Sequence, residues 1–524
     1  MTHKAASTYQ DLNEVSSRRS EFVFFVVIIL LGVLPRLGFV FLFPTQPISD
    51  FRGLVDFAIA LSDSVFARGV WQWEFFNAGL PTILSGIIRI SPASPETTAR
   101  WATAILTGLV PILPYAIWHG VLSFRARILA GLFLALWPGQ IFFSGVIAQD
   151  NWVIIPTVAL PSLAVRSLVA HDGGHPCWSA VLFALGTFIR QEMFVVLIPV
   201  ALASAGLGAG DKRLKRHLFL WMSAVLLFLL LIAGQRAVAT GRFALTTEHG
   251  GKSVLGAYVP GAGLDYWTDP SPYIASVDPS LLSDKKRLQE ESYRLALKEA
   301  LRRPKFHLIR IVSAVLNCLG RPDTSNFYWS LSASSVLPQE YTQRSDLFIK
   351  RISRLINPFM VMIHTLFLAS LLFGLFRRHW PILVVAATIL LKTLVHGVIV
   401  AQPRYFMPAI ALEWLAIALW IDDVIHSREI AQSVAITLGA VIVIFLLVIV
   451  SLKVQAYVLT HDENVQRVSQ ASKTETALPI HRIIRVACAP GRPPKERMKW
   501  SRQGPIPVEG KAFIQRGYDR CIPG

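Results

Sequence analysis

Three acidic side chains lie beside long apolar stretches of the sequence, where a carboxylate could do chemistry at a membrane boundary. Asp50 follows the first apolar run, Asp150 stands in "IAQDN" just before a later run, and Glu74 lies in the aromatic segment "WQWEFFN". Near apolar walls a carboxylate is poorly solvated and its basicity rises, so one of the three could be a general base that deprotonates an acceptor hydroxyl. Asp50 and Asp150 could also offer the hard oxygen ligands of a divalent cation. Each could instead be a solvated loop residue, and Glu74 could belong to an interfacial aromatic anchor.

Basic side chains adjoin the same kind of boundary. Arg190 in "FIRQEM" and Arg404 in "AQPRY" stand next to apolar runs, and a guanidinium fork matches the oxygens of a phosphate. Lys252 lies in the glycine-containing segment "HGGKSV", which could cradle a phosphate although it lacks the Walker spacing. The three residues are therefore candidates for binding phosphate. The alternative for the arginines is snorkelling towards lipid headgroups.

Three more residues are candidates for lining such a site. Arg36 and His396 lie inside apolar runs, where a charged or polar side chain needs a partner or a watery cavity. For Arg36 the sequence favours a structural pairing, and for His396 the alternative is a hydrogen-bonded core position. Tyr405 directly follows Arg404 and is the third candidate.

The composition indicates what kind of molecule must position these residues. The 524-residue chain is 53% hydrophobic and only 16% charged, with a mean hydropathy of +0.49. Its long, continuous apolar runs predict an all-α polytopic membrane protein and exclude a β-barrel, whose strands alternate. The net charge of +18 is typical of basic loops near anionic lipid, so we expect membrane lipids and no nucleic acid among the partners. The cysteines show no metal-ligand spacing and exclude a disulfide framework (Cys177, Cys318, Cys488 and Cys521).

The apolar runs predict about 11 transmembrane helices, because a helix needs about 20 residues to cross a membrane. Residues 1–21 contain Arg18 and Arg19 and are expected to be a cytoplasmic N-terminus, not a cleaved signal. Residues 22–453 would form the transmembrane domain, with external loops at 44–97 and 235–354, an interfacial segment at 75–90 and helices within the longer loop. Residues 454–524 form a basic tail that is expected to be disordered. The expected spans are 22–43, 98–118, 127–146, 152–170, 178–189, 192–208, 217–234, 355–376, 381–400, 405–421 and 430–452.

Counting the crossings places the candidate residues on one side of the membrane. Asp50 follows the first expected span, Asp150 the third, the loop at 235–354 the seventh, and Arg404 the ninth. All of them follow an odd number of crossings, so they face away from the basic segment "DKRLKRH", which is expected in the cytoplasm. The sequence therefore predicts a site on the non-cytoplasmic face.

The order of several short motifs along residues 22 to 425 resembles a known family. Arg36, Pro47 and Asp50 form a basic, proline and acidic succession at the end of the first span, Asp150 is a second acidic position before a span, and Arg190–Glu192 resembles an R-x-E joint. The same order is typical of the GT-C membrane glycosyltransferases, and the chain is similar to their bacterial aminoarabinose, mannosyl and galacturonosyl branch. The other segments that resemble this family are "TTEHGGKSVLGAYVPGAGLDYW" (246–267), "ALRRPKFHLIRIVSAVLNCLG" (300–320) and "PRYFMPAIAL" (403–412).

The resemblance implies a fold, a reaction and roles for residues. The fold would be a GT-C-like helical bundle in a bacterial inner membrane, and the reaction an inverting transfer of a sugar from a polyprenyl-phosphate donor to a glycan, lipid or protein of the cell envelope. Asp50 would be the base, and Arg190, Arg404 and Lys252 would hold the phosphate. Many relatives pair two acidic residues in the first loop, whereas Phe51 follows Asp50 here, which weakens the case for a metal.

Three other functions fit parts of the sequence. A transporter or lipid flippase, the main alternative, would line a path with Arg36 and His396, but the sequence shows no repeated halves. A non-catalytic anchoring subunit would tolerate Asn at its acidic positions. A ligase or polymerase of lipid-linked glycans would place key residues in a late loop, whereas the acidic candidates here come early.

Overall fold

The computed structural model describes most of the chain, and the described residues form helices and no strand. The residues outside the description are 1, 44, 46, 48, 120–121, 171–175, 197, 200–211, 246, 248–249, 261, 263–267, 321–338, 400–402, 428–434, 445 and 447–524. The predicted tail at 454–524 therefore lies outside the described residues, as do parts of the expected spans at 192–208 and 430–452.

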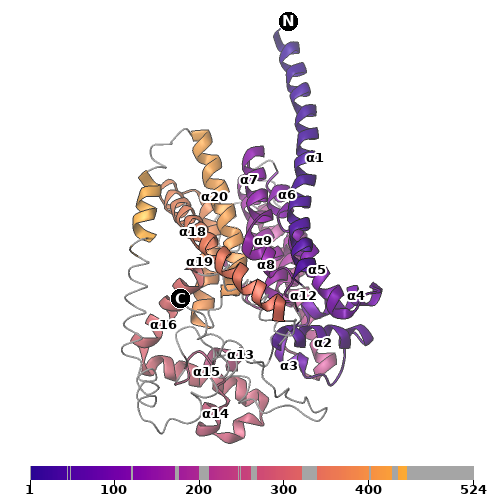
Figure 1. Ribbon diagram of the computed structural model, residues 1–524, viewed down its shortest axis with the longest axis vertical. Helices are drawn as coiled ribbons and strands as arrows, with labels where there is room; N and C mark the ends of the chain where they lie inside the picture. The colour runs from indigo at the N-terminus through magenta and orange to yellow at the C-terminus, as the bar shows by residue number, and fades with distance from the viewer. Residues whose placement is uncertain are drawn as a thin grey trace. The chain divides into compact units, whose positions relative to one another are not determined.

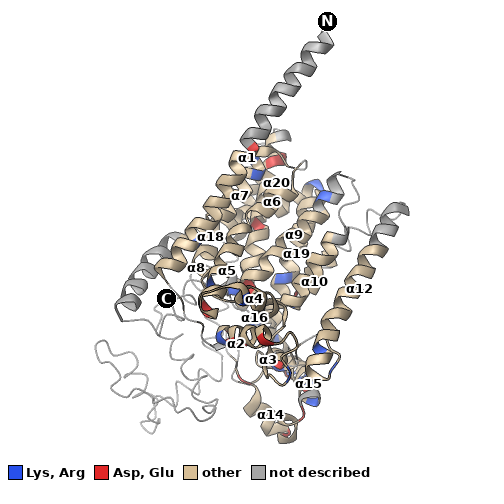
Figure 2. Cartoon of the chain, turned by 90° about the vertical axis from the view of Figure 1, so that its right-hand side faces the viewer, with Lys and Arg blue, Asp and Glu red and all other residues tan. Residues whose placement is uncertain are grey.

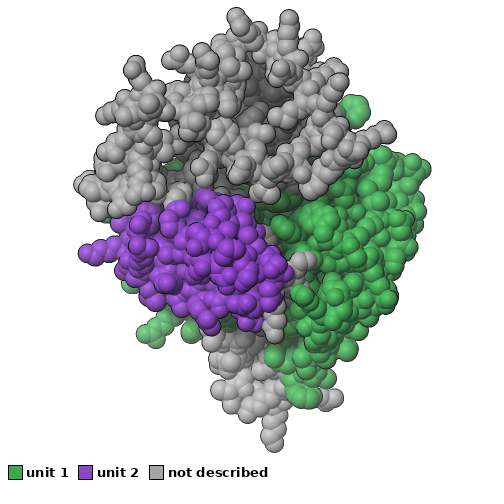
Figure 3. All heavy atoms as spheres, turned by 90° about the horizontal axis from the view of Figure 1, so that it is seen from below, with its two compact units in different colours: residues 1–250, 314–447 green, residues 251–313, 448–524 purple. Residues whose placement is uncertain are grey.

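The chain divides into two compact units, each described here by itself (Figure 3). Unit 1 comprises residues 1–250 and 314–447, and unit 2 comprises residues 251–313 and 448–524. Most of the expected spans fall in unit 1, whereas the described part of unit 2 comes from the predicted loop at 235–354. The predicted division into N-terminus, transmembrane domain and tail stays a prediction.

Unit 1 is a bundle of helices (Figure 1). Helix α20 is buried from Met407 to Trp420 and packs against α7, α9, α18 and α19, while α1 packs against α5 and α7. The helices are α1 (Thr2–Leu42), α2 (Ser49–Asp63), α3 (Gln72–Phe75), α4 (Gly79–Ile90), α5 (Pro95–Leu109), α6 (Ile112–Ile117), α7 (Phe124–Ala135), α8 (Pro138–Phe143), α9 (Gln149–Ala170), α10 (Pro176–Ile189), α12 (Lys212–Thr240), α18 (Gln339–Arg377), α19 (Trp380–Val398), η3 (Pro403–Phe406) and α20 (Met407–Ser427).

The chain is a multi-pass helical membrane protein, as its composition predicts. Five stretches of the described residues are long and apolar enough to cross a membrane, namely Glu21–Leu42, Pro95–Ile117, Phe219–Thr240, Pro358–Arg377 and Trp380–Val398. The expected count of about 11 spans is not confirmed. One reason is that the expected span at 127–146 is broken into α7 and α8, because Pro138 cannot continue the helix and instead opens the next one.

The helices of unit 1 bring a different set of residues together at each end of the bundle. At one end the chain after α1 meets the chain before α9, where the Thr45 hydroxyl donates to the Gly145 carbonyl at 2.6 Å. At the other end the Arg127 Nη2 donates to Glu21 Oε1 at 2.8 Å, and the backbone N–H of Ser123 donates to Asp422 Oδ2 at 3.2 Å. We call the first the site end and the second the opposite end. The charged residues gather towards the helix ends, and the middle lengths of the helices are mostly uncharged (Figure 2).

Arg36 is a buried structural residue within the first span. Its guanidinium donates to the carbonyls of Leu134 and Ala135 at 3.1 and 2.8 Å and to Gln140 Oε1 at 2.8 Å. Since α7 ends at Ala135, these carbonyls have no partner within their own helix. Arg36 therefore caps the break between α7 and α8, which is the structural pairing that the sequence favours for it.

The described part of unit 2 consists of short helices around a small polar interior. The helices are α13 (Gly250–Leu255), α14 (Ser271–Val277), η1 (Pro279–Leu282), α15 (Lys285–Arg302) and the first part of α16 (Pro304–Gly320). In the interior the rings of Tyr258 and His307 lie 4.8 Å apart, and the Arg310 guanidinium lies 4.7 Å from the Tyr258 ring. Burial, together with the charge of Arg310, lowers the pKa of His307 to about 4, so this side chain is neutral at physiological pH.

Candidate active site

Asp150 lies at the centre of a group of charged side chains at the site end of unit 1. It stands in the first turn of α9 and is 3% exposed. Arg190, which follows α10, donates through Nη1 to Asp150 Oδ1, and Arg404 in η3 places its Nε 3.7 Å from Asp150 Oδ2. Residues from three separate helix ends therefore meet at one carboxylate.

Glu192 is the second carboxylate of this group. Its Oε2 lies 2.9 Å from Arg190 Nε and 2.8 Å from His396 Nε2, and its Oε1 accepts from Lys392 Nζ. Lys392 is 1% exposed, and it stands one helical turn before His396 on α19, so both residues reach the same carboxylate. We call Asp150, Arg190, Glu192, Lys392, His396, Arg404 and Tyr405 the charge cluster.

Aromatic rings hold the two guanidinium groups of the cluster. The Arg190 guanidinium lies 4.3 Å from the centre of the Tyr405 ring, and the Arg404 guanidinium lies 5.1 Å from both the Tyr405 and the Phe51 rings. The Tyr405 ring is also stacked on His396, with centroids 5.1 Å apart and an interplanar angle of 27°. Contacts of this kind fix the planes of the forks.

The cluster carries more positive than negative charge. Among the described residues, the basic groups of Arg190, Lys392 and Arg404 face two carboxylates. Within the described residues the contacts of Arg190 use Nε and Nη1, which leaves the two N–H donors of Nη2 without a protein partner. A buried cluster with excess positive charge and unused donors is suited to binding an anion.

Among the described residues, the other two acidic candidates are not in the ion pairs of Asp150 and Glu192. Asp50 stands in the first turn of α2 and is exposed, directly before the Phe51 ring that contacts Arg404. Glu74 lies on the short helix α3 and is half-buried, beside the buried Trp73. Neither is shown in contact with Asp150.

Lys252, the third candidate for phosphate, belongs to unit 2. Its Nζ donates to the Ser271 hydroxyl at 2.9 Å and lies 3.7 Å from Asp269 Oδ1. Its role therefore stays a prediction, since each unit is described by itself.

The predicted metal pair of Asp50 and Asp150 stays a prediction. Both oxygens of Asp150 face guanidinium groups, and a divalent cation at that position would meet Arg190 and Arg404. Within the described ranges, no three or more His, Cys, Asp or Glu side chains are grouped to hold a metal ion.

Sequence reasoning missed Lys392 as a member of the cluster. A single lysine in the apolar run "TILLKTLVHG" has the appearance of a snorkelling residue. The available signal was its spacing of four residues from His396, which places both side chains on one face of a helix.

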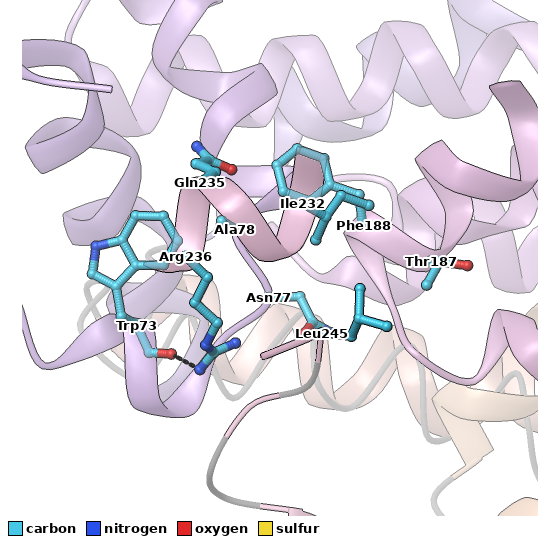
Figure 4. A pocket seen from close by; sticks show the side chains of 9 residues that line it. All are labelled: Trp73, Asn77, Ala78, Thr187, Phe188, Ile232, Gln235, Arg236 and Leu245. Carbon is cyan, nitrogen blue, oxygen red and sulfur yellow. Dashed lines mark hydrogen bonds between the residues drawn. The ribbon is translucent and has the colours of Figure 1, made fainter. Parts of the chain in front are cut away.

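A small pocket lies beside the cluster, also at the site end (Figure 4). Its volume of about 10 Å³ is the room of one water molecule, so it is too small for a sugar ring. Asn77 connects it to the cluster, because its Oδ1 accepts from Gln191 Nε2 at 2.9 Å, next to Arg190 and Glu192. The lining residues are Trp73, Asn77, Ala78, Thr187, Phe188, Ile232, Gln235, Arg236 and Leu245.

Comparisons with known proteins give only a distant structural likeness. No family model matches the chain, and no curated protein does. One similar solved structure is the crystal structure of an Archaeoglobus fulgidus oligosaccharyltransferase with Zn and sulfate, at 14% sequence identity. Another is the oligosaccharyltransferase AglB from Archaeoglobus fulgidus with an inhibitory peptide and a dolichol-phosphate, at 12% sequence identity. Each has a TM-score of 0.38, and the matches cover 81% and 82% of this chain. They span about half of the longer chains, 52% and 55%. A likeness of this degree is weak, so the function has to rest on the site itself.

Proposed function

We propose that this chain is a GT-C-type membrane glycosyltransferase that transfers a sugar from a polyprenyl-phosphate donor to a hydroxyl of a glycan, lipid or protein acceptor. One observation carries the proposal: Arg190 and Arg404, from different helix ends, converge on Asp150 at one end of an apolar bundle. Two guanidinium groups aimed at one point suit the phosphate of a lipid-linked donor, whose prenyl chain would lie in the bilayer.

Asp150 contacts both guanidinium groups, and the phosphate of a donor would compete with its carboxylate for them. The phosphodiester of such a donor offers two anionic oxygens, which can accept from the same guanidinium forks as a carboxylate. The Nη2 donors of Arg190 and the excess positive charge of the cluster would favour the exchange. Binding of donor would then release the Asp150 side chain from its arginines.

Asp50 is the residue that we assign as general base. It is exposed in the first turn of α2, and its neighbour Phe51 contacts Arg404, so α2 connects the base to the phosphate-binding group. The carboxylate would take the proton of the acceptor hydroxyl, whose oxygen attacks the anomeric carbon. The bond from that carbon to the phosphate oxygen breaks, polyprenyl phosphate leaves, and the configuration at the anomeric carbon inverts.

The orientation follows from the basic residues of the opposite end. Arg127 lies there, and Arg377 ends α18 and is followed by Arg378, at the end of α19 away from His396. Basic residues favour the cytoplasm, so the site end would face the periplasm or exterior. No nucleotide sugars are present there, which would explain a lipid-carried donor. We place the protein in a bacterial inner membrane, acting on the cell envelope.

Mass spectrometry of envelope glycolipids and glycans tests the proposal. Cells with the wild-type chain should contain a glycosylated species that is absent without the chain and absent with Asp50→Asn, since a general base contributes about 100- to 10,000-fold in rate. Asp63→Asn, at the far end of the same helix and also exposed, is the matched control and should keep the product. A product that persists in Asp50→Asn cells at normal level would remove Asp50 from the mechanism. Identical glycans with and without the chain would overturn the proposed activity.

A further inference from the structure

His396 completes a closed ring of contacts among four side chains, those of Arg190, Glu192, His396 and Tyr405. Arg190 Nε binds Glu192 Oε2 at 2.9 Å, and the same oxygen lies 2.8 Å from His396 Nε2. The face of His396 stacks on Tyr405, and the Tyr405 ring lies under the Arg190 guanidinium at 4.3 Å. His396 therefore contacts Arg190 through two neighbours, by its edge through Glu192 and by its face through Tyr405.

The ring determines which way the Arg190 fork points. The contact with Glu192 uses the Nε edge, and the contact with Tyr405 uses the flat face of the guanidinium. Only the Nη groups remain, and Nη1 is directed at Asp150. An arginine held on an edge and a face can rotate little, so its remaining donors stay aimed at one place.

Lys392 supplies the charge that keeps the ring together. Glu192 is buried, with its side chain 9% exposed, and its carboxylate contacts both Arg190 and His396. Lys392 Nζ, itself 2% exposed, binds the Glu192 oxygen that Arg190 does not use. Removing Lys392 would leave Glu192 free to turn and to share both of its oxygens with Arg190, which changes the direction of the fork.

We propose that His396 and Lys392 are positioning residues for the donor phosphate, which act through Arg190 and do not themselves touch the donor. The inference rests on the proposed function in one respect, namely that Arg190 binds the phosphate. It extends that function by assigning the α19 face of Lys392 and His396 to the donor site and by predicting that both residues lose their effect when Arg190 is absent.

A double-mutant cycle with farnesyl phosphate as the probe tests the inference on the full-length protein in lipid nanodiscs. Both Kd and the number of binding sites per folded chain are measured. We expect His396→Phe, which keeps a ring for Tyr405 but loses the contact with Glu192, to raise Kd about 5- to 10-fold at an unchanged number of sites. In the Arg190→Ala background the same change should alter Kd by less than about twofold, because residues that act through one another are not additive. Lys392→Met should behave in the same way, and Lys392→Arg should restore most of the affinity.

His364→Phe is the matched control for a purely structural effect. His364 on α18 is also a partly buried histidine paired with a buried carboxylate, since its Nδ1 lies 2.8 Å from Glu413 Oε2, but it lies outside the ring. A structural role reduces the number of competent sites and leaves Kd unchanged, and this is the result expected for His364→Phe if it has any effect.

Equal effects of His396→Phe on Kd in the wild-type and Arg190→Ala backgrounds would overturn the inference while leaving sugar transfer untouched. If the effects of His396→Phe and Arg190→Ala on Kd are coupled as expected but the chain transfers no sugar, the proposed function alone is overturned. If farnesyl phosphate does not bind the wild-type protein, the phosphate site and the inference both fail.

Discussion

Arg404 shows how a single side chain can be tested as a phosphate ligand or as a membrane anchor. Its guanidinium lies near Asp150 and over the rings of Phe51 and Tyr405. Lysine would keep the charge and lose both the fork and the flat stacking, so Arg404→Lys should weaken donor use about 3- to 10-fold and Arg404→Ala should weaken it further. The acceptor's apparent affinity should change less. Steady-state kinetics with a short-chain polyprenyl-phosphate donor measures both.

The control for this series is Arg125, which is exposed at the start of α7, at the opposite end. Arg125→Lys and Arg125→Ala should leave donor kinetics unchanged. If lysine at position 404 works as well as arginine and alanine costs little, Arg404 is a snorkelling residue. The phosphate site would then have to be sought elsewhere, beginning with Lys252.

Glu192 is predicted to matter for stability because it is surrounded by cationic groups. Glu192→Gln removes the charge that Arg190 and Lys392 share, and breaking a buried pair costs about 3 to 5 kcal/mol. Lys392→Met in the same chain should recover part of that loss, since it removes the unpaired charge. Thermal unfolding in detergent compares Glu192→Gln, the double variant and the reference variant Glu96→Gln with the wild-type protein. Glu96→Gln is the reference, because the pair of Glu96 with Arg52 is exposed and should contribute no more than about 1 kcal/mol. Equal losses at positions 192 and 96 would show that the cluster is well solvated.

Helices α1 and α5 meet at two glycines, and this contact makes a prediction about the bundle. A Cβ on Gly32 would lie 2.2 Å from the Gly108 carbonyl oxygen, so Gly32→Ala has to push the helices apart. We expect a loss of about 1 to 3 kcal/mol. Gly38→Ala on the same helix meets nothing within 4 Å and should be neutral or stabilising by up to about 1 kcal/mol. Thermal unfolding of the two variants side by side checks this. A tolerated Gly32→Ala would mean that α5 does not cross α1 so closely.

The helices and their ends could be predicted from the sequence better than the contacts between them. Apolar runs show where helices lie, and a polar residue directly after such a run must lie near a boundary, which is why Asp150, Arg190 and Arg404 could be selected. Their convergence follows from helix packing, which no local pattern encodes. The break between α7 and α8 was missed because the run at 127–146 is predominantly apolar, although Pro138 lies within it. Helix α1 begins at Thr2, well before the expected boundary at residue 22, because hydropathy reports the membrane and not the start of a helix.

The roles of the candidate residues are a different matter from their positions. A lone carboxylate or arginine is compatible with solvent, an ion pair or a substrate, and only its neighbours distinguish these. Glu192 illustrates this, because the sequence marks it only by the R-x-E joint, whereas the structure surrounds it with Arg190, Lys392 and His396. The family resemblance, the donor and the acceptor stay predictions.

At the scale of the whole molecule, the distribution of charge predicts which end faces which compartment. The net charge of +18 is large, and Arg125, Arg127, Arg377 and Arg378 lie at or beside the helix ends away from the charge cluster. Basic residues remain on the cytoplasmic side during insertion, so the site end should be outside. The site end also contains α3, because Arg236 near the end of α12 donates to the Trp73 carbonyl, and Trp73 Nε1 in turn donates to the carbonyl of Ala67, next to Arg68, at 3.2 Å.

Cysteine labelling tests this orientation in intact cells. Single cysteines replace Arg68 near the site end and Arg125 or Arg378 at the other, all three exposed, in a chain whose native cysteines (Cys177, Cys318, Cys488 and Cys521) are changed to serine. An impermeant thiol reagent applied from outside should label position 68, and positions 125 and 378 only after the membrane is permeabilised. The sugar donor reaches the site only if that end faces the compartment in which lipid-linked sugars are displayed. Labelling of positions 68 and 125 from the same side would therefore contradict both the helix arrangement and the assignment of the donor. The reverse pattern, with position 125 labelled from outside and position 68 protected, would keep the fold and place the site in the cytoplasm. A nucleotide sugar would then be the more reasonable donor.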